Sequence, residues 1–294
     1  MKKIIAKKNR ILLLVLILVG IGTVTGVVHK RLLKQPVYYR YLMEHYLPTV
    51  ADSIQETCIT ELIYITNFND KKEVVTVTFD NYPGLKVEVL DQTSERYGIY
   101  KVMTVSLYWE WDQKKDAVLP SVAKIDTIHV NYSDTSSQIV DIGQISIYSG
   151  ESSEHLLEAV DCTPLYESER VQTYETRQEL EIKGFSDSTK ETLKKADLIE
   201  SLSLTCEVMD ITNRLEPTRA SSGSQVEFKM NIKGSKENRL LELESHYDYY
   251  EIEPQILLSD KGGNEHFTTV FNPPLVLCFS NRKEIKEYLQ RRAV

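Results

Sequence analysis

The clearest pattern near the start of the sequence is an apolar run between two basic clusters. Residues 11–28, with the sequence ILLLVLILVGIGTVTGVV, contain no charged side chain. As an α-helix this run would be about 27 Å long, close to the thickness of the hydrocarbon core of a bilayer. Because a chain in lipid must satisfy its backbone hydrogen bonds internally, the run predicts a single transmembrane helix.

A cleavable signal peptide is the alternative interpretation of the same run. Signal peptides have an apolar region of about 7 to 15 residues, followed by a cleavage motif of small residues. The run at residues 11–28 is longer, and the sequence after it is HKRLLK. We therefore expect a retained signal-anchor helix there, a cytoplasmic tail at residues 1–10 and a single-pass protein of the cell membrane whose body is extracytoplasmic.

Residues 29–50 are expected to form a juxtamembrane stalk. The segment PVYYRYLMEHYLP, which begins at Pro36, is rich in tyrosine. Tyrosine is enriched at membrane interfaces, which favours a position close to the bilayer. Alternatively, the segment would form a short helix that packs Tyr38, Leu42 and His45 onto the first domain, and the sequence leaves both interpretations open.

Beyond the stalk, apolar residues alternate with polar ones at the period of a β-strand. Between residues 51 and 150 the shared strand faces hold Val75, Val77 and Phe79, then Leu85, Val87 and Val89, then Ile128, Val130 and Tyr132. In the last strand of this block the apolar parity changes between Ile142 and Ile145, and a β-bulge at Gly143 would keep both residues facing inward. Short strands separated by turns predict a β-sandwich-like domain at residues 51–150.

A polar stretch at residues 149–170, without alternation, predicts a domain boundary. Alternation then resumes on two strands, with Leu202, Leu204, Cys206 and Val208 on one and Val226, Phe228, Met230 and Ile232 on the next. We expect a second β-sandwich-like domain at residues 165–294, ending in a short helix because Asn281 and Glu284 have capping-box spacing. The predicted fold class is mostly β, with an N-terminal transmembrane helix followed by two antiparallel β-sandwich-like domains.

The net charge of −8 is distributed unevenly along the chain. Residues 1–34 contain eight basic residues and no acidic one, which leaves 27 basic and 43 acidic residues, a charge of −16, in residues 35–294. Nucleic-acid binding requires a basic face, so the acidic body argues against a nucleic-acid partner. The basic stem is instead expected to lie against an anionic lipid surface.

The four cysteines are far apart and form no C-x-x-C motif; they are Cys58, Cys162, Cys206 and Cys278. An even number of cysteines outside the cytoplasm permits disulfides. Cys206 and Cys278 both lie in apolar strands of the second block, so they are the expected pair. The alternative is that they are small buried residues with free thiols.

The densest polar cluster is ESHYDYYEIEP, at residues 244–254. Its candidate metal ligands are His246, Asp248, Glu251 and Glu253, since imidazole and carboxylate groups bind divalent cations. Strand alternation offers a simpler interpretation, in which Glu251 and Glu253 lie on a solvated outer face. We therefore predict no metal site and keep these four residues as candidates.

The sequence contains no motif of an assembled catalytic, nucleotide-binding or zinc-binding site. We therefore expect no cofactor and a non-enzymatic binding, scaffold or envelope-sensing module, held in the membrane through residues 11–28. Its partner would be a protein or a glycan of the cell envelope. The alternative is a membrane-tethered hydrolase acting on envelope material, which would use dispersed carboxylates or a Ser/Lys pair.

Overall fold

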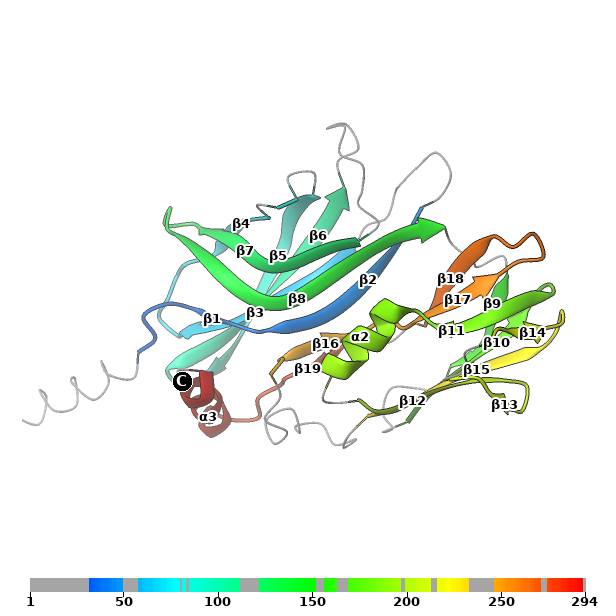
Figure 1. Cartoon of the computed structure of the whole chain (residues 1–294). Coiled ribbons are helices and arrows are strands. Elements are labelled where there is room, and N and C mark those ends of the chain that lie inside the picture. The colour runs from blue at the N-terminus through cyan, green and yellow to red at the C-terminus, as the bar shows by residue number, and fades with distance from the viewer. Residues whose placement is uncertain are drawn as a thin grey trace, which may run out of the picture.

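The computed structural model describes most of the chain after residue 31, in the ranges 32–49, 58–79, 81–82, 85–111, 122–151, 156–162, 169–196, 199–212, 216–232, 246–270 and 274–292. Strands dominate these ranges and form four sheets (Figure 1). The prediction of a mostly β chain with several antiparallel sheets is confirmed. None of the helices in these ranges is long and apolar enough to cross a membrane, and the tail and span predicted at residues 1–28 lie outside them.

The first pair of sheets encloses one cluster of buried residues, here called the first core. One sheet has the order β1 (Val37–Tyr38), β3 (Cys58–Asn67), β6 (Tyr100–Trp111), β5 (Leu85–Tyr97). The other has the order β19 (Leu275–Val276), β16 (Tyr249–Glu251), β2 (Tyr41–Thr49), β8 (Ser137–Glu151), β7 (Val122–Tyr132), β4 (Val74–Thr78). The first core joins the two sheets through residues such as Ile65, Val105 and Ile125.

The second pair of sheets encloses a separate cluster, the second core. One sheet has the order β13 (Met209–Asp210), β12 (Ile199–Cys206), β15 (Gln225–Ile232), β10 (Glu169–Thr176), β9 (Leu157–Cys162). The other has the order β14 (Thr218–Ala220), β11 (Leu180–Phe185), β17 (Gln255–Ser259), β18 (Glu265–Thr269). Phe228, Ile182 and Leu258 pack together between them. The two domain ranges expected from the sequence stay predictions.

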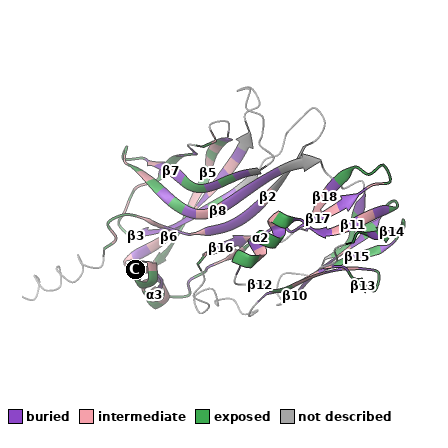
Figure 2. Ribbon diagram, viewed as in Figure 1, coloured by how far each residue is buried: buried purple, intermediate pink, exposed green. Residues whose placement is uncertain are grey.

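The segment assigned to the stalk belongs to the folded body from residue 32 onward. β2 is an inner strand of the six-stranded sheet and pairs in parallel with β8 on one side and with β16 on the other. These parallel pairs correct the expectation of purely antiparallel sheets. Residues 41–44 of β2 are buried on both faces (Figure 2), because Tyr41 and Met43 face the first core while Leu42 and Glu44 lie toward α2 (Asp187–Lys195). A strand buried on both faces lacks the apolar–polar alternation by which strands are recognised.

The bulge expected in β8 is present at Gly143. The β7–β8 register shifts beside it, between Ile125 and Thr127, and Ile142 and Ile145 are both buried. Gly143 has a φ of +88°, and a Cβ at this position would lie 2.5 Å from the carbonyl oxygen of Tyr41. Glycine therefore permits both the left-handed backbone and the close approach of β2.

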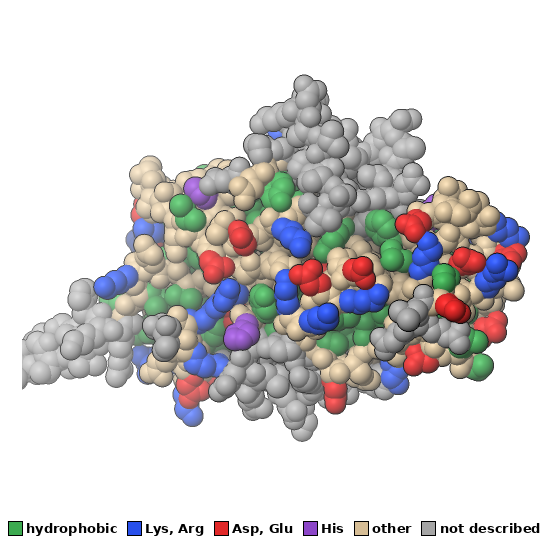
Figure 3. Space-filling view, in the orientation of Figure 1, with side chains coloured by type: hydrophobic (Ala, Val, Ile, Leu, Met, Phe, Trp, Pro, Cys, Tyr) green, Lys and Arg blue, Asp and Glu red, His purple; other side chains and the backbone are tan. Residues whose placement is uncertain are grey.

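The two helices in the described ranges connect parts that are distant in sequence. α2 begins after Ser186, whose side chain accepts a hydrogen bond from the backbone N–H of Thr189. Acidic and basic side chains are interspersed over the outer face of α2 (Figure 3). α3 (Arg282–Arg292) is capped by the predicted pair: Asn281 accepts from the N–H of Glu284, and the Glu284 carboxylate accepts from the side chain of Asn281 and from the N–H of Ser280. Its buried residue Tyr288 packs into the first core rather than the second.

Candidate functional site

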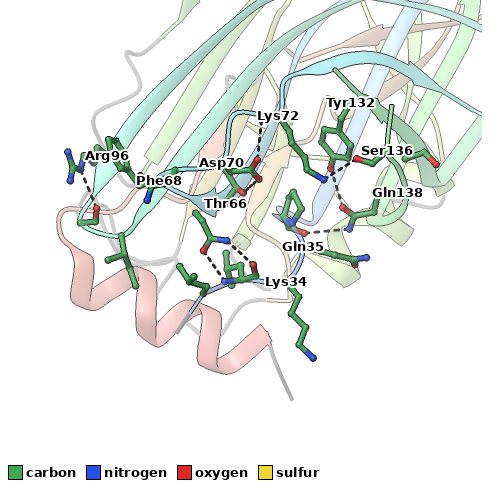
Figure 4. A pocket seen from close by; sticks show the side chains of 18 residues that line it. Lys34, Gln35, Thr66, Phe68, Asp70, Lys72, Arg96, Tyr132, Ser136 and Gln138 are labelled. Atoms are coloured by element: carbon green, nitrogen blue, oxygen red, sulfur yellow. Dashed lines mark hydrogen bonds between the residues drawn. The ribbon is translucent and has the colours of Figure 1, made fainter. Parts of the chain in front are cut away.

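A pocket of about 710 Å³ lies where residues 32–36 meet the end of the first pair of sheets (Figure 4). Its walls come from that segment, the β3–β4 connection, the β5–β6 turn and the β7–β8 turn. Ligand pockets commonly have volumes of about 300 to 1,000 Å³, so the volume suits a small molecule or a head group. The sequence reasoning did not find this pocket, because its walls come from four separate connections.

Residues 32–34 are fixed to the end of β3 by a reciprocal pair of hydrogen bonds. The backbone N–H of Leu33 donates to Oδ1 of Asn67 at 2.9 Å, and Nδ2 of Asn67 donates to the carbonyl of Leu33 at 2.7 Å. Six residues further on, the N–H of Tyr39 donates to the carbonyl of Ile63. The chain that follows the predicted anchor is thereby held against one wall of the pocket.

The β3–β4 connection forms another wall and is organised by Asp70. Its carboxylate accepts a hydrogen bond from the hydroxyl of Thr66 at 2.7 Å and one from the backbone N–H of Lys72 at 3.1 Å. The ammonium group of Lys101 donates to the carbonyl of Asp70 at 2.7 Å. The carboxylate of Asp70 is therefore occupied in shaping the turn.

Lys72 reaches across the pocket to the β7–β8 turn. Its ammonium nitrogen lies 2.9 Å from a carboxylate oxygen of Asp134 and donates to the hydroxyl of Ser136 at 3.1 Å. The hydrogen bond with Asp134 raises the pKa of Lys72. Behind it, the hydroxyl groups of Tyr38 and Tyr132 are 2.5 Å apart, which links β1 to β7. Lys72 is thus a positioned positive charge in the pocket wall.

Arg96 supplies a second positioned cation. Its guanidinium carbon lies 3.6 Å from the centroid of the Phe68 ring, and its Nε donates to the carbonyl of Gly98 at 3.2 Å. Stacking of this kind is favourable because the face of an aromatic ring carries negative charge. Lys34 is a third cation of the lining, on the segment fixed to Asn67.

The described lining therefore holds more positive than negative charge. The lining contains Lys34, Lys72 and Arg96 but only one carboxylate, that of Asp70, although Lys72 also pairs with Asp134 beside the lining. The body at residues 35–294 carries −16 overall. Apolar side chains including Leu32 lie beside the cations. This combination suits a ligand that has an anionic group next to an apolar part.

The four candidate metal ligands do not converge. His246 is exposed, and Asp248 is buried beside Arg292 of α3. Glu251 and Glu253 do come together, and the structure adds His45 of β2 to them. No local pattern in the sequence places His45 beside these carboxyl groups, because its position depends on the parallel pairing of β2 with β16.

Next to His45, the carboxyl group of Glu44 is buried under α2. Its Oε1 accepts hydrogen bonds from the hydroxyl groups of Thr192 and Tyr148. Burial raises the pKa of Glu44 to about 7, although both hydroxyl groups act in the opposite direction. No pattern in the sequence predicts this buried carboxyl group, which connects the six-stranded sheet to α2.

The expected disulfide is not formed. Cys206 is buried in the second core, whereas Cys278 is exposed, and the two are not joined. Cys278 follows β19, which pairs with β16 in the six-stranded sheet beside the first core. Strand alternation predicts the local environment of each cysteine but not the core to which its strand belongs, which explains the error.

Comparisons with known proteins identify no family. No family model and no curated protein matches the sequence. Similar solved structures include a 3Ig structure of titin domains, at 8% identity and a TM-score of 0.19, with 80% of this chain and 63% of that one covered. Another is the sialic acid binding region of a Streptococcus sanguinis SK1 adhesin, at 10% identity and a TM-score of 0.21, with 83% and 78% covered. The chain spans less than two thirds of that titin structure, and TM-scores this low do not indicate a function.

Proposed function

We propose that the chain is a single-pass membrane protein whose extracytoplasmic body binds anionic groups of the cell envelope in the basic pocket. Residues 11–28 would be the anchor, and the two pairs of sheets would act as sandwich-like domains of a non-enzymatic binding module. The observation that carries the proposal is the position of the pocket. It is built around Leu32 and Leu33, a few residues after the last residue of the predicted span, and Asn67 holds Leu33 in place.

The position and charge of the pocket favour the head group of an anionic lipid. A pocket so near the end of the predicted span would lie at the level of the lipid head groups. Its cations would meet phosphate, and Leu32 would meet the upper part of an acyl chain. Basic residues at a membrane surface contribute about 1 kcal/mol each to binding of anionic lipid. The protein or glycan partner expected from the sequence would then bind elsewhere on the body.

The hydrolase alternative would require an acid and a base that converge in a cleft. Among the described residues that line the pocket, Asp70 is the only one with a carboxyl group, and Thr66 and Lys72 hold it in the turn. Glu44, the carboxyl group with a pKa near neutrality, is not part of this lining. The lining also holds a Ser/Lys pair, Ser136 with Lys72, but Asp134 raises the pKa of Lys72 and so keeps its ammonium group charged. Binding therefore fits the pocket better than hydrolysis.

A titration of the full chain in neutral detergent tests the proposal. Short-chain phosphatidylglycerol is expected to bind, whereas the matched phosphatidylcholine is not. The double variant Lys34→Gln, Arg96→Gln should bind about 30-fold more weakly, from two contributions of about 1 kcal/mol. Arg219→Gln is the control, because Arg219 is an exposed arginine of β14 that pairs with Glu181. Equal binding of both lipids, or an unchanged affinity in the double variant, would refute the proposal.

A further inference from the structure

His45, Glu251 and Glu253 form a compact cluster outside the pocket. One potential ligand atom from each residue lies within 4.8 Å of those of the other two. Nδ1 of His45 is 3.2 Å from Oε1 of Glu253. Glu251 lies opposite Met43 in the parallel β2–β16 pair, so His45, two residues further along β2, shares its face of the sheet. Strand register, rather than proximity in sequence, therefore brings the imidazole to the two carboxyl groups.

The surroundings of the cluster carry excess negative charge. The three side chains are all half-buried, and the carboxyl groups of Glu251 and Glu253 lie within 4.8 Å of each other beside one imidazole. A cation bound in this cluster would relieve the mutual repulsion of these carboxylates.

The geometry is close to what a small divalent ion requires. Ligand atoms around a tetrahedral Zn²⁺ at about 2.0 to 2.1 Å lie about 3.3 Å apart, which the pair of His45 and Glu253 already matches. The hydroxyl of Tyr249 donates to Oε2 of Glu251 at 3.1 Å and orients that carboxylate. The side chains of His45 and Glu253 are 21% and 16% exposed, which leaves a path from solvent.

We propose that His45, Glu251 and Glu253 bind one divalent transition-metal ion of the Zn²⁺ type. An imidazole with two carboxylates favours such an ion over Ca²⁺ and Mg²⁺, which prefer oxygen ligands alone. Water would complete the coordination. The three residues come from β2, β16 and the link to β17, and β17 belongs to the second pair of sheets (Figure 1). The ion would therefore fasten the chain where it passes from the first core to the second.

Calorimetric titration of Zn²⁺ into the chelator-treated full chain in detergent tests this site. One ion is expected to bind per chain, and His45→Ala should weaken binding at least tenfold. Glu253→Gln, which keeps the shape of the side chain, should do the same and guards against misfolding of the first variant. His246→Ala is the matched control and should leave binding unchanged, because the exposed His246 is not part of the cluster.

Thermal unfolding gives a second readout for the same variants. Zn²⁺ should raise the melting temperature of the unmodified chain and of His246→Ala, but not of Glu253→Gln, because an ion that binds the folded state stabilises it. Ca²⁺ and Mg²⁺ at equal concentration should have a smaller effect. Absence of one-to-one binding, or equal binding by the unmodified chain and Glu253→Gln, would overturn the proposal.

Discussion

Arg292, in the last turn of α3, places a guanidinium nitrogen 2.6 Å from Oδ2 of Asp248, which directly precedes β16. The same oxygen accepts hydrogen bonds from the hydroxyl of Tyr288 at 2.9 Å and from the backbone N–H of Arg40 at 2.8 Å. Burial raises the pKa of Asp248, and these three groups counter that effect. One buried carboxylate therefore joins the C-terminal helix, the start of β16 and the segment before β2.

Arg292→Ala should destabilise the fold by about 3 kcal/mol, because it leaves the buried carboxylate of Asp248 without a cation. Urea unfolding followed by tryptophan fluorescence measures this loss, since Trp109 is buried in the first core. Arg291→Ala is the control. It removes the same side chain from an exposed position in the same turn and should change stability by less than about 0.5 kcal/mol. Equal effects of the two variants would show that the Asp248 pair has no special role.

Gly143→Ala should lower the free energy of unfolding by about 2 to 3 kcal/mol, because the φ is unfavourable for alanine and the new Cβ would contact the carbonyl of Tyr41. Gly263→Ala separates the two causes. Gly263 has a similar φ of +80°, and nothing lies within 4 Å of the position its Cβ would take. Gly263→Ala should lower the free energy of unfolding by about 1 kcal/mol, from the backbone conformation alone. If Gly143→Ala destabilised the fold no more than Gly263→Ala does, the close approach of β2 to β8 at Gly143 would be refuted.

The stability of the fold should depend on pH through Asp260. Hydrogen bonds from the side chain and backbone N–H of Asn264 lower the pKa of Asp260 to about 2. Because this folded-state pKa is below the unfolded value, its stabilisation is present above about pH 4 and is lost as the pH falls through about 2. Asp260→Asn should therefore lower the melting temperature at pH 7 and have little effect near pH 2. A shift of equal size at both pH values would contradict the assignment.

Asn67→Ala should release the segment that forms the near wall of the pocket. It removes both hydrogen bonds to Leu33, so hydrogen exchange should accelerate at residues 32–36 while the rest of the first core stays protected. Asn131→Ala is a suitable control, because the half-buried Asn131 bonds the side chain of Thr76 at a site outside the pocket lining. Unchanged exchange at residues 32–36 would mean that Asn67 does not hold the segment.

The sequence was most informative where one face of a strand is buried and the other is solvated. In β15, Val226, Phe228, Met230 and Ile232 are all buried, as the alternation predicts. The change of parity around Gly143 correctly predicted a bulge. The prediction for Val208 was wrong, because Glu207 adopts a φ of +58° and β12 ends at Cys206, which leaves Val208 fully exposed.

The sequence alone does not predict which distant strands pair with one another. The sequence predicts a stalk at β2 because residues 41–44 are buried on both faces, one against the first core and one under α2, and so lack strand alternation. His45 could be placed next to Glu251 and Glu253 only once the parallel register of β2 and β16 was known. The pocket depends likewise on the bond between Leu33 and Asn67, two residues that no local pattern connects.

Placement of the body outside the cytoplasm is the central claim, and the exposed thiol of Cys278 tests it most directly. The full chain with Cys58→Ser and Cys162→Ser would be treated on intact cells with a membrane-impermeant maleimide. Cys206 is buried and should not react. We predict labelling of intact cells that disappears when Cys278→Ser is added. Labelling only after the membrane is permeabilised would place the body in the cytoplasm and contradict the account.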